Sequence, residues 1–251
     1  MKKLPNPIFC MVISCIIFSC SEKSESEDTI TKPEPNAVTE APKAKAPKTI
    51  LGIDVSHFQG DVNWQEIKDA NIIFVYDKAT EGATFTDPKY AKNKVGAHEY
   101  DLAHGSYHFY TTDSDPIKQA EFFTNTIDYG IGDMPPVLDL EKGGIKGTVD
   151  PKKFQEEVLK WLNYVEQKLG VKPVIYTNHT FGDKYLTSTK FEEYQLWIAE
   201  YGVETPKVPK IWDNKGWLIW QRSERGAIEG AISQVDHDLY NPKKSFEVVK
   251  K

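Results

Sequence analysis

The chain has 251 residues, of which 39% are hydrophobic and 27% charged, and its formal net charge at pH 7 is −6. This acidic balance argues against a nucleic-acid partner, because phosphate binding requires a stripe of basic side chains. All three cysteines lie within the first 20 residues, so the remaining chain is expected to fold on its hydrophobic core without disulfides.

The first 19 residues have the pattern of a targeting signal. Two lysines precede an apolar run from Ile8 to Phe18, which is too short for a permanent membrane span. The run ends in Ile17-Phe18-Ser19-Cys20, which looks like a bacterial lipobox with Cys20 as the acylated residue. We expect residues 1–19 to be a lipoprotein signal peptide. The alternatives are an ordinary signal peptide and an uncleaved anchor.

Residues 20–48 are expected to be the lipidated cysteine and a disordered tether. They are rich in Ser, Glu, Lys, Pro and Ala and contain too few large apolar side chains to form a core. The acidic cluster from Ser21 to Asp28 resembles the surface-export signal of Bacteroidetes lipoproteins. The expected location is therefore the bacterial outer membrane, with the domain lipid-anchored on its periplasmic or cell-surface side.

Residues 49–251 are expected to form one monomeric domain, in which short apolar runs alternate with helical patterns. This alternation favours a parallel sheet or barrel. One predicted helix begins at Asn63, and three others span Pro88–Tyr100, Pro116–Ile127 and Pro151–Leu169. The predicted strands are Ile50–Val55, Ile72–Lys78, Gly105–Tyr110, Pro136–Glu141, Pro173–Asn178, Gln195–Glu200, Trp217–Gln221, Ala227–Ile232 and Gln234–Tyr240. The last three have no helix between them, so the domain is β/α in its first five units and mainly β at its end.

Two carboxylates stand at the end of the fourth predicted strand. Side chains alternate along a strand, so Asp139 and Glu141 point to the same face as Val137, while Leu138 and Leu140 point to the other. Neighbouring acids at the end of an apolar strand are costly to keep charged, so one of them should retain its proton. Acid–base chemistry on a glycosidic bond requires such a pair. The alternative is a strand that runs into a solvated loop.

Other strand ends carry polar side chains as well. In β/α barrels the C-terminal ends of the strands form the catalytic rim, so a shared site is expected there. The strand-end residues are Asp54, Lys78, Glu81, His108, Asp139, Glu141, Asn178, Glu200, Tyr201, Gln221 and Asp236.

Short motifs accompany the strands in a fixed order. They are GIDVSHFQG (52–60), FVYDKATEG (74–82), GSYHF (105–109), VLDLE (137–141), PVIYTN (173–178), LWIA (196–199), WQ (220–221) and VD (235–236). From Ile50 to Tyr240 the chain thereby resembles glycoside hydrolase family 25, the Chalaropsis-type lysozymes or N-acetylmuramidases. The resemblance implies an irregular, TIM-like (β/α)5(β)3 barrel. It also implies hydrolysis of the β-1,4 bond between N-acetylmuramic acid and N-acetylglucosamine in peptidoglycan or a related N-acetylated glycan.

The resemblance further implies roles for individual residues. Glu141 would be the general acid, and Asp139 would stabilise the oxocarbenium-like centre or orient the 2-acetamido group of the substrate. Asp54 and Asp236 would position water or Asp139 and tune the charge. The residues expected to contact substrate are Tyr107, Lys78, Glu81, Tyr176, Asn178, Trp197 and Gln221. Lys78 with Glu81 can instead be a structural ion pair, and the aromatic residues can be core.

Three residues depart from the family pattern. Asp77 replaces an apolar strand residue, Arg222 an aromatic and Asp238 an asparagine, and all three are expected to change the charge near the rim. Because of these three residues, the family pattern does not determine the exact substrate or the hydrogen-bond partners of Asp236.

Two other functions compete with hydrolysis. His104 and His108 suggest a zinc-dependent glycan deacetylase, but they lie on a strand without a third ligand at a known spacing, so no metal or other cofactor is expected. A glycan-binding lipoprotein without turnover is the third possibility, although the four acids argue against lost activity.

Overall fold

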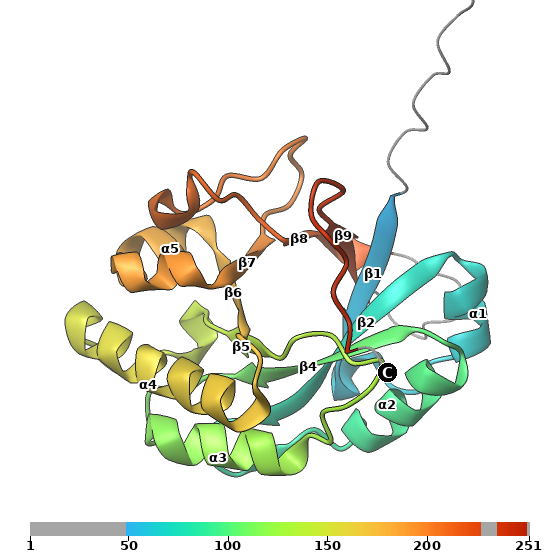
Figure 1. The fold of residues 1–251 in the computed structure, drawn as a ribbon, viewed down its shortest axis with the longest axis horizontal. Coiled ribbons are helices and arrows are strands. Elements are labelled where there is room, and N and C mark those ends of the chain that lie inside the picture. The colour runs from blue at the N-terminus through green and yellow to red at the C-terminus, as the bar shows by residue number, and fades with distance from the viewer. Residues whose placement is uncertain (1–48, 227–234, 250–251) are drawn as a thin grey trace, which may run out of the picture. The chain divides into compact units, whose positions relative to one another are not determined.

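The computed structural model describes residues 49–226 and 235–249 (Figure 1). The strands are β1 (Ile50–Val55), β2 (Ile72–Glu81), β3 (Phe85–Thr86), β4 (Ala103–Phe109), β5 (Val137–Asp139), β6 (Val174–Asn178), β7 (Gln195–Ala199), β8 (Ile219–Gly226) and β9 (Val235–Tyr240). The α-helices are α1 (Trp64–Asp69), α2 (Tyr90–Glu99), α3 (Pro116–Thr126), α4 (Pro151–Leu169) and α5 (His179–Tyr185). None of the described helices has the length and apolar character needed to cross a bilayer.

The strands close into a barrel. Their order is β1-β9-β8-β7-β6-β5-β4-β2, and β2 pairs back with β1, while the short β3 extends the outer edge of β2. Strand β9 runs antiparallel to both of its neighbours, and the other neighbours in the ring are parallel. Figure 1 shows the five helices outside the ring.

The predicted (β/α)5(β)3 barrel is confirmed, with two elements that we did not predict. Helices α1 to α5 follow β1, β2, β4, β5 and β6, and the described connection from β7 to β8 contains only the 3-10 turn Lys210–Trp212. Helix α5 and strand β3 were missed because each is short. The predicted strand Ala227–Ile232 lies outside the described residues.

Local sequence explains where the long helices begin and end. Asp115 and Asp150 cap α3 and α4 by accepting hydrogen bonds from the next turn, and each is followed by proline at the first helical position. Gly170, with a φ of 73°, ends α4 in the left-handed conformation that glycine tolerates. The apolar face of α4 packs with α3 and α5 against the outside of the barrel.

The end of the barrel opposite the catalytic rim is filled by aromatic side chains. Tyr76 is fully buried, packs against Trp197 with 4.8 Å between ring centroids, and donates a hydrogen bond to the Pro135 carbonyl. Phe246 from the C-terminal segment packs against Phe74, with ring centroids 6.1 Å apart. This packing closes the floor and leaves the opposite rim for a binding site.

Gly105 makes this floor possible, which gives the first prediction. A Cβ at Gly105 would lie 2.0 Å from the ring of Tyr76, whose position is held by its hydrogen bond. Gly105→Ala should therefore destabilise the fold by about 1–3 kcal/mol through overpacking. Urea unfolding measures this effect, with Gly130→Ala as the control because no atom lies within 4 Å of the added methyl. Equal stability of the two variants would contradict the packing argument.

Candidate active site

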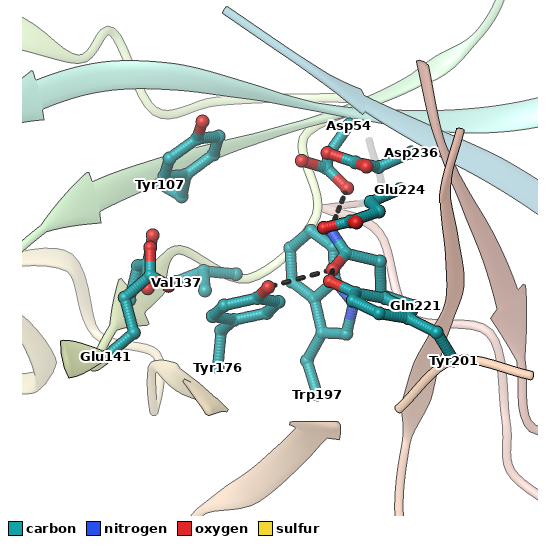
Figure 2. Close-up of a pocket in the computed structure, with 11 residues that line it drawn as sticks. Asp54, Tyr107, Val137, Glu141, Tyr176, Trp197, Tyr201, Gln221, Glu224 and Asp236 are labelled. Atoms are coloured by element: carbon teal, nitrogen blue, oxygen red, sulfur yellow. Dashed lines mark hydrogen bonds between the residues drawn. The ribbon is translucent and has the colours of Figure 1, made fainter. Parts of the chain in front are cut away.

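A polar cavity of about 230 Å³ opens at the C-terminal ends of the parallel strands (Figure 2). The strand ends of β1, β4, β5, β6, β7 and β8 contribute to it, and so does the beginning of β9. Because β9 runs antiparallel, its first residues lie at the rim where the parallel strands end. The lining residues are Asp54, Tyr107, Val137, Asp139, Glu141, Tyr176, Trp197, Tyr201, Gln221, Glu224 and Asp236.

The four acids that the sequence analysis singled out line this one cavity. Figure 2 shows Glu141 with Tyr107 on one side and Asp54 with Asp236 on the other. Asp54 and Asp236 are direct partners in the β1–β9 ladder, so the barrel closure itself brings their carboxyl groups together. The expected convergence of acids from distant segments is therefore present in the structure.

Asp139 and Glu141 reach the cavity through strand alternation. Asp139 is the last residue of β5, and Glu141 keeps an extended backbone with φ −144° and ψ 174°. Leu138 and Leu140 point away from the cavity into the outer core. The side chains on the two faces of this segment therefore follow the predicted pattern.

Burial raises the pKa of both carboxyl groups in this pair. For Asp139 burial is the main cause and the negative charge of Glu141 adds to it, while Lys78 opposes the shift. For Glu141 burial again raises the pKa and Lys78 again opposes it. Asp139 is 7% exposed, and its Oδ1 has no hydrogen-bond partner among the described residues. The pair thus favours a bound proton, which an acid catalyst needs at neutral pH.

The opposite side of the cavity holds a second group of acids. Burial, followed by the charges of Asp236 and Asp238, raises the pKa of Asp54 well above its usual value. Asp236 is the direct ladder partner of Asp54, and its negative charge makes Asp54 harder to ionise. Burial also raises the pKa of Asp236 to about 6. Asp238 is fully buried and accepts a hydrogen bond of 3.0 Å from Trp197 Nε1.

Gln221 connects this acid group to two tyrosines. Its Nε2 donates to Asp54 Oδ2 over 2.7 Å, and its Oε1 accepts from Tyr176 over 2.8 Å and from Tyr201 over 2.6 Å. The two tyrosine hydroxyls fix the amide orientation, because only its NH₂ group can then face Asp54. The side chain thus holds Asp54 in place while presenting two aromatic rings to the cavity.

Four of the seven predicted substrate-binding residues line the cavity: Tyr107, Tyr176, Trp197 and Gln221. Lys78 and Glu81 do not line it and instead form an ion pair of 2.6 Å, with Lys78 Nζ 4.7 Å from the centroid of the Phe109 ring. Asn178 is also absent from the lining, because its Oδ1 accepts from the Phe181 amide and caps α5.

Two polar lining residues had no role assigned from the sequence. Tyr201 stands just after β7 and was recognised only as a strand-end residue. Glu224 lies in β8, where the pairing register with β9 shifts after Gln221 and again after Ser223. Such irregularities break the alternation on which a prediction of facing side chains depends, so the sequence pattern contained no signal for Glu224.

Two of the three departures from the family pattern lie outside this cavity. Asp77 is fully buried and pairs with Asn93 and His104, while Arg222 is exposed and does not line the cavity. Asp77 faces outward because it alternates with Tyr76 and Lys78 along β2, so its carboxyl group does not line the cavity, although its charge is among the causes of the raised pKa of the lining residue Tyr107. Asp238 does act on the site, since its charge contributes to the raised pKa of Asp54.

The paired histidines do not form the zinc site of a deacetylase. His108 is buried between Thr80 and Gln119, at 2.7 and 3.1 Å, and burial lowers its pKa to about 3. His104 faces Asp77 and Asp133 instead. Both rings point away from the cavity because they alternate with Tyr107 along β4. The structure therefore offers this alternative no shared ligand set for His104 and His108.

The Asp236 carboxyl group should make stability depend on pH. Its pKa is raised from 3.8 to about 6 in the folded state, so the folded protein binds more protons than the unfolded chain between these values. The stability that this proton contributes is lost as the pH rises through about 6. Asp236→Asn should therefore gain stability relative to wild type between pH 4 and pH 7, by roughly 1–3 kcal/mol.

Thermal unfolding at the two pH values measures this difference, and Asp69→Asn is the control because Asp69 is exposed on α1. A difference between Asp236→Asn and wild type that stays the same at both pH values would contradict the raised pKa of Asp236.

Comparisons with known proteins agree with this geometry. Residues 53–231 match the model of glycosyl hydrolases family 25. A protein of Escherichia coli O6:H1, named uncharacterized protein YegX, is 35% identical over 200 residues, covering 77% of this chain and 70% of that protein. Lysozyme M1 of Streptomyces globisporus is 30% identical over 76% of this chain and 68% of its own length. The crystal structure of the bacterial lysozyme from Streptomyces coelicolor matches with a TM-score of 0.72 and 27% identity, over 78% of this chain and 94% of that one. The chain belongs to glycosyl hydrolases family 25.

Proposed function

We propose that this protein is a muramidase that hydrolyses the β-1,4 bond between N-acetylmuramic acid and N-acetylglucosamine in peptidoglycan. The observation that carries the proposal is the buried Asp139–Glu141 pair in a cavity rimmed by Asp54 and Asp236. Membership of a glycoside hydrolase family and similarity to proteins named lysozyme support it.

Glu141 is assigned the role of general acid. Burial raises its pKa, so its carboxyl group is protonated over a wider pH range than an exposed glutamic acid. It donates its proton to the glycosidic oxygen as the bond from that oxygen to the anomeric carbon breaks, and positive charge develops on the sugar ring. Lys78 limits the shift of the Glu141 pKa without entering the cavity.

With the proton of the pair on Glu141, Asp139 is a carboxylate, and we assign it to stabilise the positive charge that develops on the sugar. Its carboxyl group lies on the same face of the strand as Glu141 and is 7% exposed, so little water competes with it. It acts either directly on the oxocarbenium-like centre or by orienting the 2-acetamido group of the substrate. Asp54, which accepts a hydrogen bond from Gln221, and its ladder partner Asp236 position the attacking water from the opposite side.

The general-acid role predicts the behaviour of Glu141→Gln. The substitution keeps the shape of the side chain but removes the transferable proton, so kcat should fall by about 10²–10⁴-fold without loss of thermal stability. In the wild type, activity should persist above pH 4.5, the usual pKa of glutamic acid, and decline as the pH rises through the higher pKa of Glu141.

Clearing of a peptidoglycan suspension measures the rate, and mass spectrometry of the products identifies the sugar with the new reducing end. Glu193→Gln is the control, because Glu193 is exposed and forms an ion pair with Lys172 on the protein surface. Activity retained by Glu141→Gln would reject its role. A reducing end on N-acetylglucosamine, or release of acetate, would reject the muramidase assignment.

We also propose that the enzyme is held at the bacterial outer membrane by a lipid on Cys20, with residues 21–48 as a tether. The apolar run before Cys20 and the polar composition after it support this proposal. The acidic cluster from Ser21 to Asp28 favours display on the cell surface. A linker composition between the anchor and the domain suits an enzyme that must reach a substrate as large as peptidoglycan.

Cys20→Ser tests the anchor. Expressed in a bacterium with lipoprotein processing, the wild-type chain should incorporate labelled fatty acid and enter the detergent phase on partitioning. The variant should do neither, and Cys15→Ser should behave like the wild type because Cys15 lies within the signal segment. Unchanged labelling of Cys20→Ser would exclude Cys20 as the lipidated residue.

A further inference from the structure

A cluster of two histidines and an aspartate lies on the outer face of the barrel, apart from the catalytic cavity. His98 stands near the C-terminal end of α2, His104 on β4, and Asp133 in the segment before β5. A β-bridge between His104 and Asp133 brings the last two together. One ligand atom from each of the three residues lies within 4.8 Å of the others. The mechanism proposed above uses none of them.

The distances suit a small tetrahedral ion. His98 Nε2 lies 3.1 Å and His104 Nδ1 lies 3.5 Å from the same oxygen, Asp133 Oδ1. Ligands about 2.0–2.1 Å from a tetrahedral Zn²⁺ are separated from each other by about 3.3–3.4 Å. The three donors therefore need only small adjustments to share one ion.

His104 has unused binding capacity. Its side chain is fully buried, and neither ring nitrogen has a hydrogen-bond partner among the described residues. Its Nε2 faces Asp77 Oδ2 at 4.0 Å, and Asp77 Oδ1 accepts a hydrogen bond from Asn93. A carboxylate behind the second nitrogen of a metal-binding histidine fixes the ring and increases its basicity. The unexpected Asp77 therefore occupies the place of an outer partner to a histidine ligand.

Hydrogen bonds also fix the orientation of the Asp133 carboxylate. Its Oδ2 accepts hydrogen bonds from the Gly130 amide over 2.9 Å and from Lys94 over 3.1 Å. These bonds hold the carboxylate so that Oδ1 faces the two imidazole rings. The positive charge of Lys94 is paired with Oδ2, on the side of Asp133 away from the proposed ion.

The cluster is open to solvent on one side. The His98 side chain is 36% exposed and lines a surface hollow together with Tyr90 and Lys94. An ion can enter there, and a water molecule can take the fourth position of the tetrahedron.

We propose that His98, His104 and Asp133 form a binding site for Zn²⁺. Two imidazole nitrogens and one carboxylate oxygen are the donor set that this borderline ion accepts. The ion would join α2, β4 and the segment before β5, and so stabilise the outer wall of the barrel. The site is separate from the catalytic cavity, so a chelator should leave the muramidase reaction intact. This inference does not rest on the proposed function.

The cluster has a competing explanation. It can be a network of charged hydrogen bonds in which a protonated His104 lies between Asp77 and Asp133. It requires no metal and predicts no selective zinc affinity. Titration of the chelator-treated, untagged protein with Zn²⁺ distinguishes the two. The site predicts one saturable equivalent, a rise in thermal unfolding temperature on binding, and the visible spectrum of tetrahedral Co²⁺ when cobalt replaces zinc.

His98→Ala should weaken Zn²⁺ binding at least ten-fold and abolish the thermal shift. His98→Gln is the second variant, because it retains a polar side chain at the same position but is a poor zinc ligand. His179→Ala is the matched control: His179 lies 3.3 Å from Asp183 on the surface and has no third ligand in the described structure. No saturable binding, or an affinity unchanged in both His98 variants, would overturn the proposal.

Discussion

The pairing of β9 with β1 is the contact on which the rest of the site depends. It closes the barrel, and because β9 is antiparallel it places Asp236 directly opposite Asp54 at the catalytic rim. The same ladder sets Asp238 opposite Gly52, two positions further along, in a fully buried environment. A ninth strand running parallel would have delivered its last residues to this rim instead. Strand direction therefore decides which acids meet.

Once these acids meet, burial raises the pKa of the carboxyl groups on both sides of the cavity. On one side burial and the charge of Asp236 raise the pKa of Asp54, while Gln221 opposes this shift by donating a hydrogen bond to Asp54. On the other side Lys78 moderates the raised pKa values of Asp139 and Glu141 from a position outside the lining.

Periodicity predicted a parallel sheet or barrel, and the resemblance to the family chose the barrel. The strand ends predicted the meeting of the four acids, because alternation and strand direction bring their side chains to one rim. Predictions for single side chains at the rim were less accurate. Asn178 and Lys78 both end predicted strands, as several lining residues do. However, Asn178 caps the backbone of α5 and Lys78 forms an ion pair with Glu81, so neither side chain lines the cavity. Glu224 was missed because a register shift in β8 is invisible in a pattern of alternating residues. His104 and Asp133 are 29 residues apart, and only folding shows that they adjoin.

The aromatic floor has a consequence for how a polymer can be processed. The side chains of Tyr76, Phe74 and Phe246 fill the barrel below the acids, so no open channel runs through its interior at this level. A glycan strand cannot be threaded through the domain and must lie across the mouth, with both of its ends outside. A closed floor of this kind imposes no requirement for a free end of the glycan strand.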